Sequence, residues 1–170
     1  MSMIYQDSSN FGKQIPIYVR YKVLEDSTKA VSTTVANIYA GLPVTVSCSG
    51  DLTAVTTNVA VYGLAKFQYN GQLDEVTGTQ PAGIYGSNKG TVVVKGIVDV
   101  LTVMPFTDAC SVHLVDTVGL VPMAPLYVSC VANGDGVYPI SANVATWTNT
   151  QFGVVLNYDS TNGVLQILLP

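Results

Sequence analysis

The strongest hydrophobic pattern in the chain is the run Thr91–Met104, which follows a stretch rich in glycine, serine and asparagine. Its even positions from 92 to 100 are four valines and one glycine, whereas its odd positions mix apolar residues with Lys95 and Asp99. β-Branched residues at this density favour an extended backbone, because their side chains pack well on a pleated surface. Since successive side chains of a strand point to opposite faces, the run predicts a long central strand with one apolar face and one half-apolar face.

The same alternation predicts shorter strands along the rest of the chain, separated by turns. Asn70-Gly71 is the strongest hairpin signal, since both residues tolerate the positive φ of a type I′ turn. No window has a helical period. The expected strands are Ile15–Val23, Val44–Cys48, Val55–Val61, Leu64–Tyr69, Cys110–Val115, Leu126–Val131, Val137–Ile140, Gln151–Tyr158 and Gly163–Leu169. The chain is therefore predicted to be all-β, a compact β-barrel or β-sandwich with an extended N-terminal arm.

The first residues are polar and aromatic without a regular period, and Pro16 interrupts the alternation that follows them. Such a segment is typical of an arm that becomes ordered on a partner. We expect residues 1–20 to form this arm, with Tyr5, Phe11 and Ile15 as its anchors. Residues 21–170 are expected to form a single β-domain.

Charged residues are scarce: they make up 11% of the chain, against roughly 25% in typical domains, while hydrophobic residues make up 48%. No apolar run reaches the roughly 20 residues that span a bilayer, so we expect no membrane insertion. A chain of this composition is expected to bury part of its surface against other subunits, because large exposed apolar patches usually mark interfaces.

The charges are unevenly distributed. All seven lysines and arginines lie before Gly96, and the chain beyond it contains five aspartates and no basic residue. A protein without a basic stripe binds nucleic acid poorly, because phosphate neutralisation supplies most of that affinity. We therefore expect no nucleic-acid partner.

Few residues suggest chemistry. His113 is the only histidine, and Asp116 would point to the opposite face of the same strand, so a catalytic pair is not expected there. The carboxylates at Asp74-Glu75 and in Asn133–Gly136 lack the ligand-rich loop of a calcium site, and plain turns are expected. The chain has none of the common hydrolase, metalloprotease or phosphate-loop motifs. We expect no cofactor, no metal and no enzymatic activity.

The cysteines, Cys48, Cys110 and Cys130, are odd in number and have no CxxC spacing. We expect them to be buried, reduced thiols that act as small hydrophobic residues. That state suits assembly in a reducing cytoplasm.

Small residues and short strands follow one another in a characteristic order over about residues 40–170. The segments that carry this order are Tyr62–Ala65, Pro81–Gly83, the valine-rich Gly90–Val100 (GTVVVKGIVDV), Pro125–Ser129, Phe152–Leu156 and Gly163–Leu169. In these segments the chain resembles the decoration, or cement, proteins of tailed bacteriophage capsids. The resemblance implies a compact, usually trimeric β-domain on the outer capsid surface, where major capsid subunits meet. It implies no catalytic residues, and the N-terminal arm lies outside it.

These observations predict a structural virion protein that stabilises a phage capsid as a homotrimer bound to the major capsid protein. The expected capsid contacts are Tyr5, Phe11, Lys13, Ile15 and Arg20 in the arm, where the two cations would face acidic capsid patches. The expected contacts between copies are Val93, Ile97 and Leu101.

Two alternatives remain. A tail or head-fibre module that binds host carbohydrate would display aromatic clusters in concave pockets. A small β-barrel hydrolase would hold His113 in a cleft beside a carboxylate and a nucleophilic serine or threonine.

Overall fold

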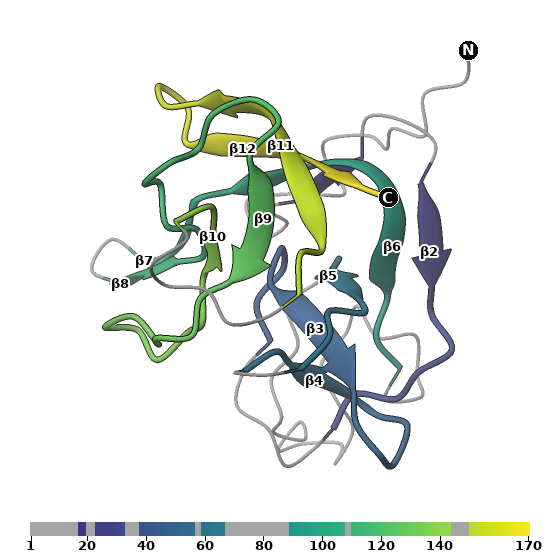
Figure 1. The fold of residues 1–170 in the computed structure, drawn as a ribbon. Coiled ribbons are helices and arrows are strands. Elements are labelled where there is room, and N and C mark those ends of the chain that lie inside the picture. Colours follow the sequence, from purple (N-terminus) through teal and green to yellow (C-terminus); the bar gives the residue numbers. More distant parts are fainter. Residues whose placement is uncertain are drawn as a thin grey trace.

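The structure is a computed structural model that describes residues 17–19, 23–32, 38–56, 59–66, 89–107, 110–143 and 150–170 (Figure 1). These residues form twelve β-strands and no α-helix. Ten strands belong to one curled, antiparallel sheet, and the other two form a separate hairpin. The expectation of an all-β barrel or sandwich is confirmed in this form.

Strand β6 (Val92–Leu101) organises the large sheet, because four other strands pair with it. Both β2 (Leu24–Asp26) and β5 (Gly63–Ala65) pair with its first residues, so they must flank it on opposite edges. Further along, β1 (Ile17–Val19) and β12 (Val164–Leu169) flank its second half in the same way. Figure 1 shows β2 beyond β6, away from β5 and from the end of β12.

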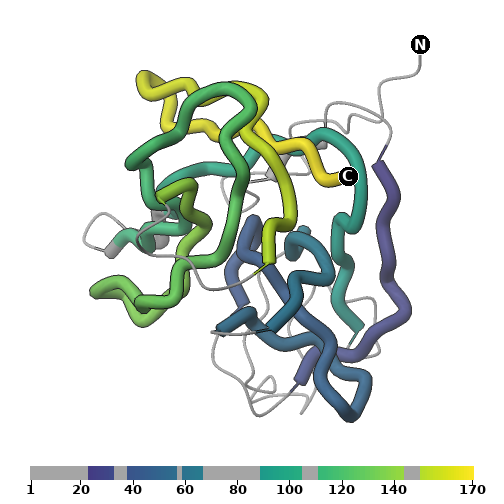
Figure 2. Tube along the Cα trace, viewed as in Figure 1, coloured from purple at the N-terminus to yellow at the C-terminus, as the bar shows by residue number. Residues whose placement is uncertain are grey.

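The remaining strands extend the sheet from β12 on one side and from β5 on the other, in the order β10-β9-β11-β12-β6-β5-β3-β4. Figure 2 shows how the two ends of this order curl toward each other around the interior. Their bounds are β3 Pro43–Val46, β4 Leu52–Ala54, β9 Pro125–Val128, β10 Ile140–Ser141 and β11 Gly153–Asp159.

A β-bulge in β6 changes which residues face the core. Glu25 of β2 pairs with Val93 and Leu24 pairs with Lys95, so Val94 is an extra residue on β6. Gly96 follows with φ of 120°, a conformation that other residues rarely adopt. The inserted residue moves every following side chain of β6 to the opposite face of the sheet. Odd-numbered residues before this point and even-numbered residues after it therefore face the same side.

The shift explains why the predicted single apolar face is wrong. Val93, Val98 and Val100 share the main hydrophobic core, although Val93 is an odd position and the others are even. Val92 packs instead in a second, smaller cluster with Val44, and Val94 lies against that cluster.

The predicted central strand also ends earlier than expected, at a bend on Thr102. The backbone N–H of Thr102 donates to Gly163 O at 2.8 Å, while Thr102 O accepts from Leu114 N at 2.8 Å. One residue thus bonds both to the large sheet and to the chain that leaves the hairpin. That hairpin consists of β7 (Val103–Thr107) and β8 (Cys110–His113).

Other strand predictions have mixed outcomes. The strands expected at Val44–Cys48, Leu64–Tyr69, Cys110–Val115, Leu126–Val131, Gln151–Tyr158 and Gly163–Leu169 correspond to β3, β5, β8, β9, β11 and β12, several of them shorter than expected. The strand expected at Val137–Ile140 is wrong except for its last residue, because β10 begins at Ile140. The strand expected at Val55–Val61 is wrong, and the chain forms β4 just before it. Strand β2 was not expected.

Some predictions concern residues that the structure does not describe. The Asn70-Gly71 hairpin lies outside the described residues, as do residues 1–16 and 20 of the expected arm. Only Ile17–Val19 of that arm is described, as β1 paired with β6. The division into an arm of residues 1–20 and a domain of residues 21–170 stays a prediction.

Glycine 63 lets β5 approach β6 closely. A Cβ atom on Gly63 would lie 2.5 Å from Val93 O and 2.6 Å from Val92 Cγ1. Because the first of these atoms belongs to the backbone of the central strand, it cannot move aside cheaply. Gly63 therefore fixes the join between β6 and the β3–β4–β5 part of the sheet.

Candidate interaction site

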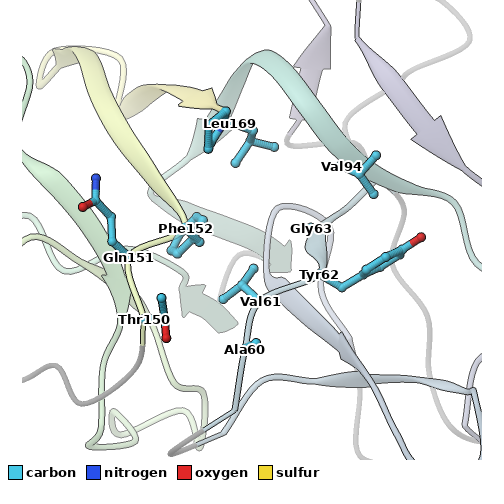
Figure 3. A pocket seen from close by; sticks show the side chains of 10 residues that line it. Ala60, Val61, Tyr62, Gly63, Val94, Thr150, Gln151, Phe152 and Leu169 are labelled. Atoms are coloured by element: carbon cyan, nitrogen blue, oxygen red, sulfur yellow. The ribbon is translucent and has the colours of Figure 1, made fainter.

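A cavity of about 240 Å³ opens where β5 and β12 diverge along β6 (Figure 3). The β6 bulge contributes Val94, and the other apolar lining residues include Val61, Phe152 and Leu169. Gln151 lies at the same cavity, and its side-chain amide donates to Gly153 O at 3.3 Å. The cavity thus offers both apolar and polar contact to a ligand.

Tyr62 is the one lining residue among those described that has an ionisable side chain, and its hydroxyl is engaged elsewhere. Figure 3 shows this hydroxyl directed away from Phe152, and it donates a hydrogen bond to Asp26 Oδ2. The two aromatic rings therefore do not form a common platform in the cavity. The arrangement is not that expected of a carbohydrate-stacking site.

Asp26 is a polar junction between β2 and the segment that enters β5. Its Oδ1 accepts from the backbone N–H of Thr28 at 2.8 Å and from the Thr28 hydroxyl at 2.6 Å, while Lys29 Nζ lies 3.7 Å from Oδ2. The Thr28 hydroxyl and then Tyr62 hold the pKa of Asp26 at about 2, below its ordinary 3.8. The hydrogen bond from Tyr62 to Asp26 raises the pKa of Tyr62, because the carboxylate stabilises the protonated tyrosine.

His113 pairs with a carboxylate other than Asp116. Its Nδ1 lies 3.1 Å from Asp135 Oδ2, and its backbone N–H donates to the same oxygen at 2.9 Å. Asn133 Nδ2 donates to His113 O at 2.8 Å, so two side chains of one turn bind the end of β8. These bonds from His113, the backbone one first, lower the pKa of Asp135.

Asp116 bonds elsewhere, to Val118 N at 3.0 Å and to the Ser141 hydroxyl at 3.1 Å. This agrees with the expectation that His113 and Asp116 do not pair. The His113 side chain is 61% exposed, and among the described residues no serine or threonine hydroxyl bonds to it. The pair joins a turn to a strand end and lies outside the cavity.

The thiols differ from expectation. Cys48 is exposed rather than buried, because it lies in the β3–β4 turn, and Cys130 is partly buried. The side chain of Cys110 lies outside the described part. Within the described ranges, no three histidine, cysteine, aspartate or glutamate side chains gather closely enough to hold a metal ion.

The segment between β8 and β9 exposes three large apolar side chains. Val118 is 60% exposed, Val121 59% and Met123 70%. The backbone beneath them is fixed: Met123 N donates to Val155 O at 2.7 Å, and Ala124 N donates to Val121 O at 3.0 Å. We call these three residues the loop surface. Sequence alternation did not single them out, because they belong to a turn and not to a strand.

Met123 is also the described non-glycine residue with positive φ, at 68°. A left-handed backbone costs a residue with a Cβ roughly 1–2 kcal/mol. The hydrogen bond to β11 holds it there despite this cost. Such strain is common where a surface makes specific contacts.

The expected contact residues fall into two groups. The expected capsid contacts Tyr5, Phe11, Lys13, Ile15 and Arg20 lie outside the described residues. Of the expected contacts between copies, Val93 is a core residue with 0% exposure, so its side chain offers no surface to a partner in this conformation. Ile97 and Leu101 are partly buried, and their role stays a prediction.

Comparisons of the chain with models of protein families, with curated proteins and with solved structures each gave no match. In the described part of the chain, no helix is long and apolar enough to cross a membrane.

Proposed function

We propose that this chain is a non-enzymatic structural protein of a phage virion, which binds the outer capsid surface at junctions between major capsid subunits and stabilises the shell. The observation that carries the assembly role in this proposal is the loop surface, where three apolar side chains are presented on a fixed backbone. Apolar patches of this kind on soluble proteins usually mark protein interfaces. The choice of a phage shell as the partner rests on the resemblance of residues 40–170 to capsid decoration proteins.

The size of the loop surface favours binding through many copies. Fully burying one valine or methionine side chain contributes about 1.5–3 kcal/mol, so covering the exposed parts of three contributes about 3–5 kcal/mol. Association of two proteins costs about 4–15 kcal/mol in lost freedom and ordering. One such patch alone therefore supports only weak, concentration-dependent association, whereas an oligomer on a repeating shell gains from effective concentration.

In this proposal the arm carries the shell contacts. Tyr5, Phe11 and Ile15 supply apolar anchors, and Lys13 and Arg20 supply positive charge. A clamp that covers a subunit junction opposes its opening, because opening exposes the surface that the clamp had buried.

The experiment is immunogold labelling of intact virions of the phage that encodes this chain, followed by rebinding of purified protein to shells from which it was removed. We expect labelling over the head surface. A full-length Tyr5→Ala/Phe11→Ala variant should sediment with shells much less than the native protein does. Val131→Ala, a change at an exposed position of the described domain, is the matched control and should bind normally.

Two results would contradict the proposal. Intact virions whose heads carry no label would contradict the capsid role. Full rebinding by the double arm variant would contradict the role of the arm and leave the capsid role in place.

A further inference from the structure

Another exposed apolar side chain of the described surface lies beside a cation, away from the loop surface. Leu24 of β2 is 60% exposed and pairs in register with Lys95 of β6, whose side chain is also exposed. Directly paired residues on neighbouring strands lie on the same face. We call Leu24 and Lys95 the edge surface.

The edge surface is positively charged, because nearby acids already have partners. Glu25 accepts from Lys66 Nζ at 2.9 Å, and Asp26 lies 3.7 Å from Lys29 Nζ. Lys95 makes no ion pair with another described residue, so none of the described acids neutralises its charge.

The loop surface lies in the part of the chain with the opposite charge. From Cys110 onward the sequence contains Asp116, Asp135 and Asp159 and no lysine or arginine. Asp116 is the acid next to the loop surface, since it accepts from the backbone N–H of Val118. One copy of the chain thus carries an apolar surface in acidic surroundings and an apolar surface beside the Lys95 cation.

The two surfaces are far apart on one copy. The loop surface is bonded to β11 and leads into β9, whereas the edge surface lies on β2 and β6. Because β12 lies between β11 and β6 and β2 lies beyond β6, the surfaces are on different sides of the curled sheet (Figure 1). A contact between the loop surface of one copy and the edge surface of another is therefore head-to-tail.

We propose that copies of this chain assemble through this contact, with Val121 and Met123 of one copy packed against Leu24 of the next, and Lys95 facing the acidic side of its neighbour. A head-to-tail contact closes into a ring when its rotation permits and cannot form a two-fold dimer. This inference deepens the self-association included in the proposed function and does not depend on the shell.

The test uses the purified full chain alone, by light scattering and sedimentation over a range of concentrations. The native chain is expected to form an oligomer of at least three 18.0 kDa copies. Met123→Asp and Leu24→Asp should each reduce the mass to that of one copy, since each places a carboxylate in an apolar contact. Val131→Asp, a change at a residue that is 61% exposed outside both surfaces, should leave the oligomer intact.

Mixing the two variants gives the decisive result. Each retains the surface that the other lacks, so an equimolar mixture at the highest concentration should form a species of two copies, one of each variant, joined by a single loop–edge contact. Aspartate tolerates positive φ better than methionine, and position 24 is exposed, so both variants should keep the native circular dichroism spectrum. If Leu24→Asp failed to fold, Lys95→Glu would replace it, because it reverses the charge of the edge surface at an exposed side chain.

Three outcomes would overturn the inference: a native chain of one copy at every concentration, a variant that keeps the native mass, or a mixture that forms no two-copy species. If virions were unlabelled while the variants behaved as expected, the capsid role would fail and the head-to-tail contact would stand.

Discussion

Replacing Asp26 by asparagine removes a charge from the junction between β2 and the entry to β5. The aspartate accepts hydrogen bonds from Thr28 and Tyr62, with Lys29 nearby. Asparagine retains an oxygen that accepts from Thr28 but lacks the negative charge. The pH dependence of the difference between the two proteins therefore reports the part of the stability that depends on ionisation.

The magnitude follows from the pKa of Asp26, which is about 2 instead of its ordinary 3.8. Each pKa unit corresponds to about 1.4 kcal/mol, so the charge stabilises the fold by at most about 2.5 kcal/mol. Between these pKa values the unfolded chain binds more protons, so this contribution rises with pH. It should be complete above about pH 5 and disappear as the pH falls through about 2.

Urea unfolding of the native chain and of Asp26→Asn, at one protein concentration and at several pH values, measures this contribution. We expect the native chain to be more stable by about 1–2 kcal/mol at neutral pH, with the two curves converging near pH 2. Tyr62→Phe should remove part of the same difference, because the second-largest cause of the low pKa is lost. A gap that stays constant from neutral pH to pH 2 would refute the reasoning, since a charge-independent packing defect would then explain it.

Two further substitutions test the backbone. Gly63→Ala should lower the free energy of unfolding by about 1–3 kcal/mol or more, the cost of an overpacked core, because the new Cβ would lie 2.5 Å from Val93 O. The control is Gly134→Ala, where no atom lies within 4 Å of the new Cβ. Equal losses of stability from both substitutions would contradict the structure. Met123→Val should lower the free energy of unfolding by about 1 kcal/mol, since a β-branched residue tolerates φ of 68° poorly. Met123→Asn should leave it unchanged or raise it. Calorimetry that found the asparagine variant less stable than the valine variant would disprove the backbone strain.

The sequence predicted the fold class because strands such as β6, β11 and β12 show their alternation directly. It failed where one residue changes the register. Val93 and Val94 are both valine, so nothing in the pattern marks Val94 as the inserted residue, and only pairing with β2 reveals it. Thr102 is likewise an ordinary strand residue in sequence, and its bend depends on bonds to residues 163 and 114.

The β4 error has a local cause. Ser47 N donates to Asp51 O at 2.8 Å, and this short turn places Leu52–Ala54 directly opposite β3. The apolar residues from Val55 onward suggested a strand, but the hairpin geometry had already determined the pairing. Turn length therefore decided the register here, and the hydrophobic pattern did not.

The candidate site was harder to predict than the fold. The His113–Asp135 pair joins residues 22 positions apart, and no spacing rule connects them. Val118, Val121 and Met123 are typical core residues by composition, and only the structure shows that they are exposed. Their one visible signal was Pro122 and Gly119 between them, which mark a turn and not a buried strand.

The position of β6 has a consequence for synthesis of the chain. Its partner β1 precedes it by about 80 residues and its partner β12 follows it by more than 60. During translation, the edge of β6 that binds β12 therefore keeps its backbone N–H and C=O groups unpaired until β12 leaves the ribosome. Pairings so distant in sequence form slowly, and an open apolar edge can bind other nascent chains. We expect yield in a host cell to depend strongly on growth temperature and on chaperones, most of all for variants that weaken the pairing of β6 with β12.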